Sequence, residues 1–255
     1  MTWIPGVSLG STAENVSSGV VVERRRLLWL PVAAAGLLLG RETARGESRG
    51  SRSKEGLAWE EFLAACVPSA KRLYESDDFD EDTYLYHIAT FAARLTEIPN
   101  QELGDFGNLE PSVETGLSHR GFPFIVIQWR MEPGAILPAH CHPDTAVCTL
   151  AVEGEARIRN FEIEGEAPAH NSGSGASFLM RETHNDILTP GRINTLSTTR
   201  DNIHCFEAST AGARGIDITT PFGGDGSFSF IDFDPDKPRD GARRLFEAVW
   251  IGSKL

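Results

Sequence analysis

The chain has 255 residues, of which 40% are hydrophobic, and a formal net charge of −12. This length and composition allow one large domain with a buried core. The excess of acidic residues argues against a nucleic-acid partner, whose phosphates require clustered Lys and Arg. The 4 cysteines include no C-x-x-C pair, so neither a disulfide framework nor a cysteine-rich zinc site is expected.

The N-terminal part contains an apolar run, Leu27–Leu39, directly after the arginines at positions 24 to 26. At about 1.5 Å per residue, a helix over this run is too short to cross about 30 Å of hydrocarbon, so no stable membrane span is expected. The order Arg-Arg-x-Leu-Leu is similar to the bacterial twin-arginine export signal. Residues 1–56 are therefore interpreted as a twin-arginine-like leader with a flexible polar linker. This predicts an exported, periplasmic or extracytoplasmic protein, and a cytoplasmic one if the leader carries no such address.

Residues 57–110 carry two helical periods and are expected to form a cap against a larger domain. Pro68 is expected to end the first helix. The apolar positions of that helix are Trp59, Phe62, Leu63 and Cys66. The second helix follows the acidic segment 77–82, where carboxylates favour a helix N-terminus. Its apolar positions are Leu85, Ile88, Phe91 and Leu95. His87 in this helix is expected to pack or to face solvent, and not to bind a metal.

From about Pro111 onward, short apolar runs alternate with turn residues, and no helical period separates them. The first runs end at Pro133-Gly134, at Gly154 and at Gly165. Later runs cover residues 193–199, 202–209, 215–222 and 227–235. This pattern predicts a mainly β domain, an antiparallel sandwich or small barrel, over residues 111–255 with a C-terminal extension.

The segment Leu137–Asp144, LPAHCHPD, contains the clearest candidate for chemistry. Because successive side chains of a strand face opposite sides, His140 and His142 are expected to point the same way and Cys141 the other way. The two histidine Cα atoms would lie about 6.5 to 7 Å apart, which lets both imidazoles bind one ion. Imidazole suits zinc, copper, nickel and iron, so this spacing does not select the metal.

The surroundings of these histidines resemble a known motif. Gly134 lies six residues before His140 and Gly154 twelve after His142, which resembles the first cupin motif, G-x5-H-x-H-x3,4-E-x6-G. Val147 stands where the motif has its glutamate. The segments ILPAHCHPD, DNIHCFEAS and DITTPF are similar to the thiol dioxygenases among the cupins. They are most similar to the branch of cysteamine dioxygenase and the plant cysteine oxidases, and more distantly to cysteine dioxygenase.

This resemblance implies a cupin-type double-stranded β-helix, a small jelly-roll barrel, preceded by two α-helices. It also implies non-haem Fe(II) bound by His140, His142 and, as the third ligand, His204 of the NIH sequence. The implied reaction converts a small amino-thiol, or the N-terminal cysteine of a peptide, to a sulfinate with O₂. No protein side chain is assigned a catalytic role. Three neutral imidazoles leave a divalent ion its full charge, which favours a thiolate ligand.

The sequence departs from cysteine dioxygenase in ways that bear on the substrate. The early segment SVETGL lacks the arginine that holds the substrate carboxylate there, and the nearest candidates are Arg120 and Arg130. This disfavours free cysteine. Val147 and Ile218 stand about where that enzyme cross-links a cysteine to a tyrosine, and Asp217 is near an aspartate of the plant branch.

Two other classes of function remain open. The first is a cupin enzyme that uses zinc or manganese for isomerisation or hydrolysis, with Glu182 or His184 as general base. The second is a non-enzymatic, metal-binding sensor or binding module. No oligomeric state is predicted.

The remaining candidate side chains have simpler interpretations. Cys141 and Cys205 are expected to be small buried residues beside the ligands. His119, in the turn SHRG, and His170, in a Gly-Ser loop, are expected to be solvated. Three aromatic residues are expected in the core: Trp129, Phe161 and Phe206.

Overall fold

The computed structural model describes residues 56–76, 80–105, 113–169, 175–222 and 229–252. The twin-arginine-like leader, nearly all of the linker, and His170 lie outside the described residues. None of the described helices combines the length and the apolar character that crossing a membrane requires.

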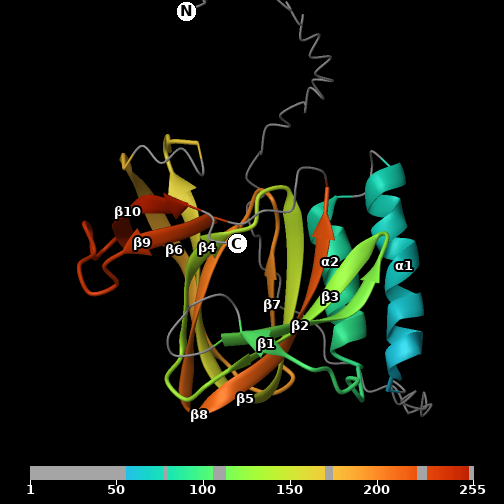
Figure 1. Ribbon diagram of the computed structural model, residues 1–255. Coiled ribbons are helices and arrows are strands. Elements are labelled where there is room, and N and C mark those ends of the chain that lie inside the picture. Colours follow the sequence, from blue (N-terminus) through green and yellow to red (C-terminus); the bar gives the residue numbers. More distant parts are fainter. Residues whose placement is uncertain (1–55, 77–79, 106–112, 170–174, 223–228, 253–255) are drawn as a thin grey trace, which may run out of the picture. The chain divides into compact units, whose positions relative to one another are not determined.

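The described chain is mainly β, with two helices before the sheet (Figure 1). The first strands are β1 (Gly104–Asp105), β2 (Val113–Gly121), β3 (Phe124–Met131), β4 (Ile136–Cys141) and β5 (Thr145–Glu164). The later strands are β6 (Ser177–Leu188), β7 (Ile193–Leu196), β8 (Ile203–Pro221), β9 (Ser229–Phe233) and β10 (Leu245–Gly252).

Six strands close into an antiparallel barrel in the order β8-β4-β9-β10-β6-β5, because β5 pairs back with β8. Strands β3, β2 and β1 extend the sheet from β8, and β7 adds to the other edge of β5. The predicted fold class, a mainly β barrel preceded by two α-helices, is confirmed.

The two longest strands, β5 and β8, correct the sequence-based expectation of separate short runs. Gly154 does not end a strand, because β5 continues through a register shift at this position. Its φ is +65°, and an added Cβ would lie 2.1 Å from the carbonyl oxygen of Gly212, so the close approach requires glycine. The two strands therefore bend together and pair with different neighbours along their two halves. The first half of β8 pairs with β4 and its second half pairs with β3.

Four strands are not recognised in the sequence, namely β1, which lies in the expected helical cap, and β2, β6 and β10. β2 and β6 are rich in polar and charged residues, whereas β10 carries an apolar run, Ala248–Ile251, within the segment expected to be a C-terminal extension. The prediction that His119 lies in a solvated turn is wrong. His119 lies within β2, is half-buried, and its ring is 5.2 Å from that of Phe124.

The helices are α1 (Trp59–Glu75) and α2 (Glu81–Ala92). Pro68 does not end α1 but lies inside it, although a proline in a helix interior costs about 3 kcal/mol. The turns after it are held by tertiary contacts: Ala70 is fully buried, and Ser69 Oγ lies 3.1 Å from His87 Nδ1. His87 is thus packed between the helices, as expected. Helix α2 begins at the N-cap Asp80, whose side chain accepts from the N–H of Thr83.

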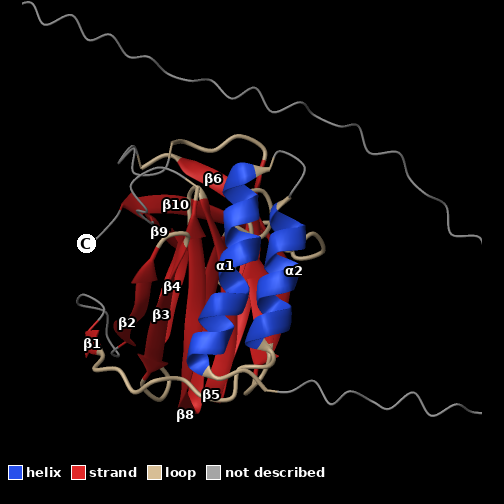
Figure 2. Cartoon of the chain, turned by 90° about the vertical axis from the view of Figure 1, so that its right-hand side faces the viewer, coloured by secondary structure: helices blue, strands red, loops and turns tan. Residues whose placement is uncertain are grey.

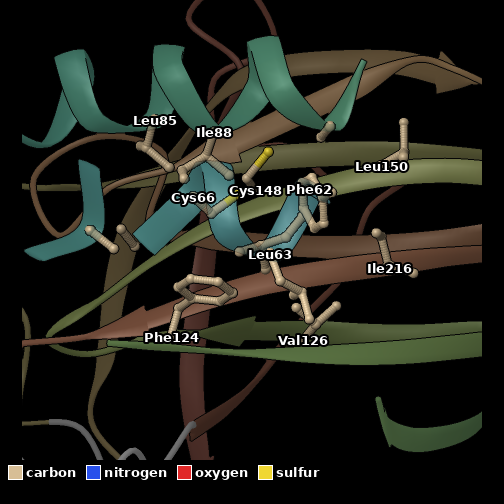
Figure 3. Packing of buried hydrophobic residues seen from close by; sticks show 14 of the residues in the cluster. Phe62, Leu63, Cys66, Leu85, Ile88, Phe124, Val126, Cys148, Leu150 and Ile216 are labelled. Atoms are coloured by element: carbon tan, nitrogen blue, oxygen red, sulfur yellow. The ribbon is translucent and has the colours of Figure 1, made fainter. Parts of the chain in front are cut away.

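The helices cover the outer side of the wall formed by β3, β8 and β5 (Figure 2). Phe62, Leu63 and Cys66 of α1 pack with Leu85 and Ile88 of α2 (Figure 3). The sheet residues in this cluster include Phe124, Val126, Cys148, Leu150 and Ile216. In β3 the even-numbered residues Phe124 and Val126 face the helices, while Ile125 and Ile127 line a cavity on the inner side. The alternation of β3 thus separates a closed outer core from an inner cavity.

Candidate metal centre

The three candidate ligands come from two neighbouring strands. His140 is in β4, His142 directly follows it, and His204 is in β8, where it is the register partner of His140. A bulge between Leu137 and His140 changes the alternation, so Leu137, His140 and His142 all line the inner cavity. Cys141 faces the opposite side, in a cluster that includes Phe161. The predicted orientation of this segment is confirmed.

The imidazoles meet through their Nε2 atoms. His204 Nε2 lies 2.9 Å from His140 Nε2 and 3.0 Å from His142 Nε2. Three nitrogen atoms bound to one ion at about 2.0 to 2.1 Å, with cis or tetrahedral angles, lie about 2.8 to 3.4 Å apart. The observed spacing fits such a group at its short end. These three histidines form a buried group that could bind a metal ion.

The three imidazoles are also in the neutral state in which a histidine can bind a cation. His140 Nδ1 lies 2.8 Å from the carbonyl oxygen of Pro138, so Nδ1 carries the proton and Nε2 presents its lone pair. Burial lowers the pKa of His140 to about 4. Burial, followed by the neighbouring histidines, holds the pKa values of His142 and His204 well below the usual range. Three neutral imidazoles with converging Nε2 atoms are the donor set that a divalent ion requires.

His140 and His142 open on a cavity of about 210 Å³ between β2, β3, β4 and β8. Its walls are mainly apolar: Val113, Ile125, Ile127, Trp129, Met131, Leu137, Phe206 and Pro221. Its polar lining, besides His140 and His142, consists of Thr115, Thr145, Asp217 and Thr219. No Lys or Arg of the described chain lines this cavity.

Asp217 is the carboxylate of this cavity. Thr149 Oγ1 donates to its Oδ1 at 2.6 Å and Trp129 Nε1 donates to the same oxygen at 3.2 Å. Burial raises the pKa of Asp217 to about 6, against the lowering effect of these two hydrogen bonds. Because both donors reach Oδ1, the other carboxylate oxygen is available to a ligand in the cavity.

The aromatic and polar supports of the site were missed in the sequence. Trp129 and Phe206 are buried core residues, as predicted, and both also line the cavity, where the Phe206 ring is 4.7 Å from that of His204. No sequence pattern marks Thr149 as a site residue. Trp129 and Thr149 contribute to the site because they donate to Asp217, and Phe206 because it packs against His204. No sequence motif marks these positions. Phe161 is a core residue, as predicted.

Several residues that the sequence suggests for the site do not line the cavity. Glu182 forms ion pairs with Arg159 at 2.6 Å and with Arg244, and it does not line the cavity. His184 is exposed. Two sequence candidates for carboxylate binding, Arg120 and Arg130, are exposed and also absent from the cavity wall.

Cys141, Cys205 and Ile218 do not line the cavity and are packed elsewhere in the fold. Burial raises the pKa of both the Cys141 and the Cys205 thiol to about 11, so both are protonated at neutral pH. Cys205 is half-buried and lies on the outer side beside Arg159. Ile218 belongs to the cluster under the helices and therefore points away from the cavity.

Comparison with known proteins gives no family model that matches the chain. Similar solved structures include the KdgF protein from Halomonas sp., with 17% identity and a TM-score of 0.34 over 49% of this chain and 94% of that chain. An RmlC-like cupin from Shewanella frigidimarina has 17% identity and a TM-score of 0.33, over 48% of this chain and 85% of the other. A predicted oxalate decarboxylase from Thermotoga maritima has 10% identity and a TM-score of 0.34, over 50% and 98%.

The fold and the site together define an antiparallel β-barrel protein with a buried three-histidine group at the wall of a mainly apolar cavity.

Proposed function

We propose that the protein is a non-haem Fe(II) thiol dioxygenase, which adds both atoms of O₂ to the sulfur of a small amino-thiol or of an N-terminal cysteine. The observation that carries the proposal is the convergence of three neutral imidazoles, with no carboxylate of the described chain joining the group. The similarity of LPAHCHPD and NIH to the thiol dioxygenases selects iron from the metals that imidazole suits.

Ferrous iron, which His140, His142 and His204 would hold, would supply binding positions for the thiolate and O₂ and the capacity for electron transfer. The reaction is balanced as R–SH plus O₂ giving R–SO₂H, in which the sulfur is oxidised and both oxygen atoms become bonded to it. The three imidazoles contribute no charge, so the ion keeps its affinity for a thiolate. The apolar walls exclude water and hold the carbon chain of the substrate close to the histidines.

Asp217 supports an amine-bearing substrate. An ionised carboxylate in an otherwise apolar cavity favours a cationic group, and no Lys or Arg on the described wall offsets its charge. A substrate carboxylate would meet the negative charge of Asp217 without a partner, which is unfavourable. Asp217 would therefore accept a hydrogen bond from the ammonium group while the thiol reaches the histidines.

A second candidate uses the same residues differently. A zinc or manganese enzyme needs a general base near the ion, and Asp217, with a pKa of about 6, meets this requirement better than Glu182 or His184. In that case Asp217 would take a proton from water or from the carbon of a substrate.

The test is oxygen uptake by the full-length protein after anaerobic loading with Fe(II). Cysteamine, cysteine, 3-mercaptopropionate and a peptide that begins with cysteine are compared, and the product is identified as the sulfinate by mass spectrometry. We expect uptake with an amine-bearing thiol and none with 3-mercaptopropionate, and complete loss in His204→Ala. If the protein binds metal but takes up no oxygen with any thiol, the dioxygenase is rejected and the zinc or manganese enzyme is tested next.

A further inference from the structure

Two buried polar atoms next to the metal centre lack a hydrogen-bond partner. They are His204 Nδ1 and Asn160 Oδ1. Asn160 is 1% exposed and His204 is 0% exposed. A buried polar atom without a partner costs about 1 to 3 kcal/mol, so each such atom requires an explanation.

The two residues are direct partners in the pairing of β5 with β8. Their side chains share the inner face, because the pair Ile158 and Phe206, two residues away on each strand, packs in the apolar cluster inside the barrel. The intervening Arg159 and Cys205 face the outer side. Directly opposed residues on one face have Cβ atoms about 4.5 to 5.5 Å apart, which is within the reach of a side-chain hydrogen bond.

The two atoms are chemically complementary. His204 Nε2 points at the other two histidines, so a metal on that nitrogen leaves the proton of the neutral ring on Nδ1, a donor. The amide of Asn160 is oriented by Nδ2, which donates to Asn194 Oδ1 at 3.3 Å, so its oxygen is an acceptor without a donor.

His140 provides the internal comparison. Its Nδ1 donates to the backbone carbonyl of Pro138 at 2.8 Å, which fixes both the tautomer and the direction of the ring. Metal-binding histidines generally have such a partner on the second nitrogen, and its loss weakens metal binding about 10- to 100-fold. His204 has no backbone carbonyl in this role, since its Nδ1 has no partner among the described residues.

We propose that Asn160 is the positioning residue of His204. When His204 Nε2 binds the metal, Asn160 Oδ1 accepts a hydrogen bond from the Nδ1–H of the same imidazole. This inference rests on metal binding by the three histidines, which is part of the proposed function, and not on the reaction that the metal performs. Asn194 then acts through Asn160 by holding its amide in the accepting orientation.

The test measures the dissociation constants of Zn(II) and Co(II) for the metal-free full-length protein by competition with a chelator. Asn160→Leu removes the acceptor at nearly constant volume, and we expect binding about 10- to 100-fold weaker. Asn160→Asp keeps an acceptor oxygen and should bind close to the wild type. Gln128→Met is the matched control: it removes another buried strand amide, bonded to Pro99 and Ser118 on the outer side, and should leave metal affinity unchanged.

A second readout does not depend on the stability of a variant. In the zinc-loaded wild type, long-range ¹H–¹⁵N NMR should show an exchange-protected Nδ1–H of His204, and Asn160→Leu should lose that protection. Unchanged affinity in a folded Asn160→Leu protein, or an unprotected Nδ1–H in the wild type, would overturn the role of Asn160 and leave the three-histidine site intact. Failure of the wild type to bind either metal would overturn the site itself, whereas absence of oxygen uptake would concern only the reaction.

Discussion

The two sides of the barrel wall differ in how their buried polar groups are satisfied. On the helix side, Tyr84 Oη is hydrogen-bonded to Thr220 Oγ1, and Ser69 pairs with His87. On the inner side, the adjacent residue Thr219 has a buried hydroxyl without a partner, as do His204 at Nδ1 and Asn160 at Oδ1. Among the described residues, the helix side therefore has no buried side-chain polar atom without a partner. The inner side has three, and a bound ligand would supply their partners or bring them together.

The largest expected effect comes from removing a histidine of the inner side. His140→Ala should weaken metal binding by more than the about 10- to 100-fold that follows loss of an orienting partner, since a ligand atom itself is lost. His87→Ala, which removes a histidine from the helix side, should keep its metal. Metal content after dialysis against limiting Zn(II) measures both. Equal metal content in the two variants would show that the inner side is not the metal site.

The helix side should respond to substitution in stability instead. Phe62 is fully buried between α1 and the sheet, so Phe62→Ala should lower the free energy of unfolding by about 3 to 5 kcal/mol. Metal affinity of the protein that remains folded should not change. Denaturant unfolding and metal titration on the same sample separate the two effects, and a parallel loss of affinity would contradict the division between the two sides.

Asp217→Asn should change substrate preference without removing the metal. Loss of a charge-assisted hydrogen bond of about 1.5 to 3 kcal/mol would raise KM for cysteamine about 10- to 100-fold and affect 3-mercaptopropionate little. In the wild type, KM for cysteamine should rise as pH falls through about 6, because protonation of Asp217 removes its charge. The variant should lack this dependence. A pH profile shared by both proteins would assign the titration to another group.

Protonation of Asp217 has opposite effects on substrate binding and on stability: it weakens the binding of cysteamine but stabilises the folded state. The pKa of Asp217 is raised from 3.8 to about 6 in the folded protein, so the folded state binds the proton more tightly than the unfolded state. Its contribution to stability is thus present below pH 3.8 and is lost as pH rises to about 6. Relative to the wild type, Asp217→Asn should become progressively more stable over this range. Denaturant unfolding at several pH values measures the difference between the two proteins.

The smallest effect is expected for Tyr84→Phe. Loss of its hydroxyl leaves Thr220 without its partner on the helix side and should lower stability by about 1 to 2 kcal/mol. Oxygen uptake and metal affinity should remain at the level of the wild type, since Thr220 faces away from the cavity that Thr219 lines. Loss of activity without loss of stability would show that the two sides are coupled.

Local patterns predicted the parts of this molecule that depend on periodicity. The i, i+3, i+4, i+7 spacing from Trp59 indicated α1, and the i, i+2 spacing of His140 and His142 indicated that both face one side. The same local rules failed at Pro68 and Gly154, which were expected to end elements and instead lie inside them. Packing of the residues after Pro68, and the close approach of Gly154 to Gly212, overrode the local preference.

By itself, the sequence determined the helical periods, the direction of the two neighbouring histidines and, through resemblance, the third candidate ligand, His204. Only the tertiary structure decided that His204 meets His140, 64 residues away, that Asp217 shares their cavity, and that Asn160 lies opposite His204. The physical reason is that a side chain's face follows from its neighbours in sequence. Its partners across a barrel depend on strand pairing, bulges and bends that form only when distant segments pack together.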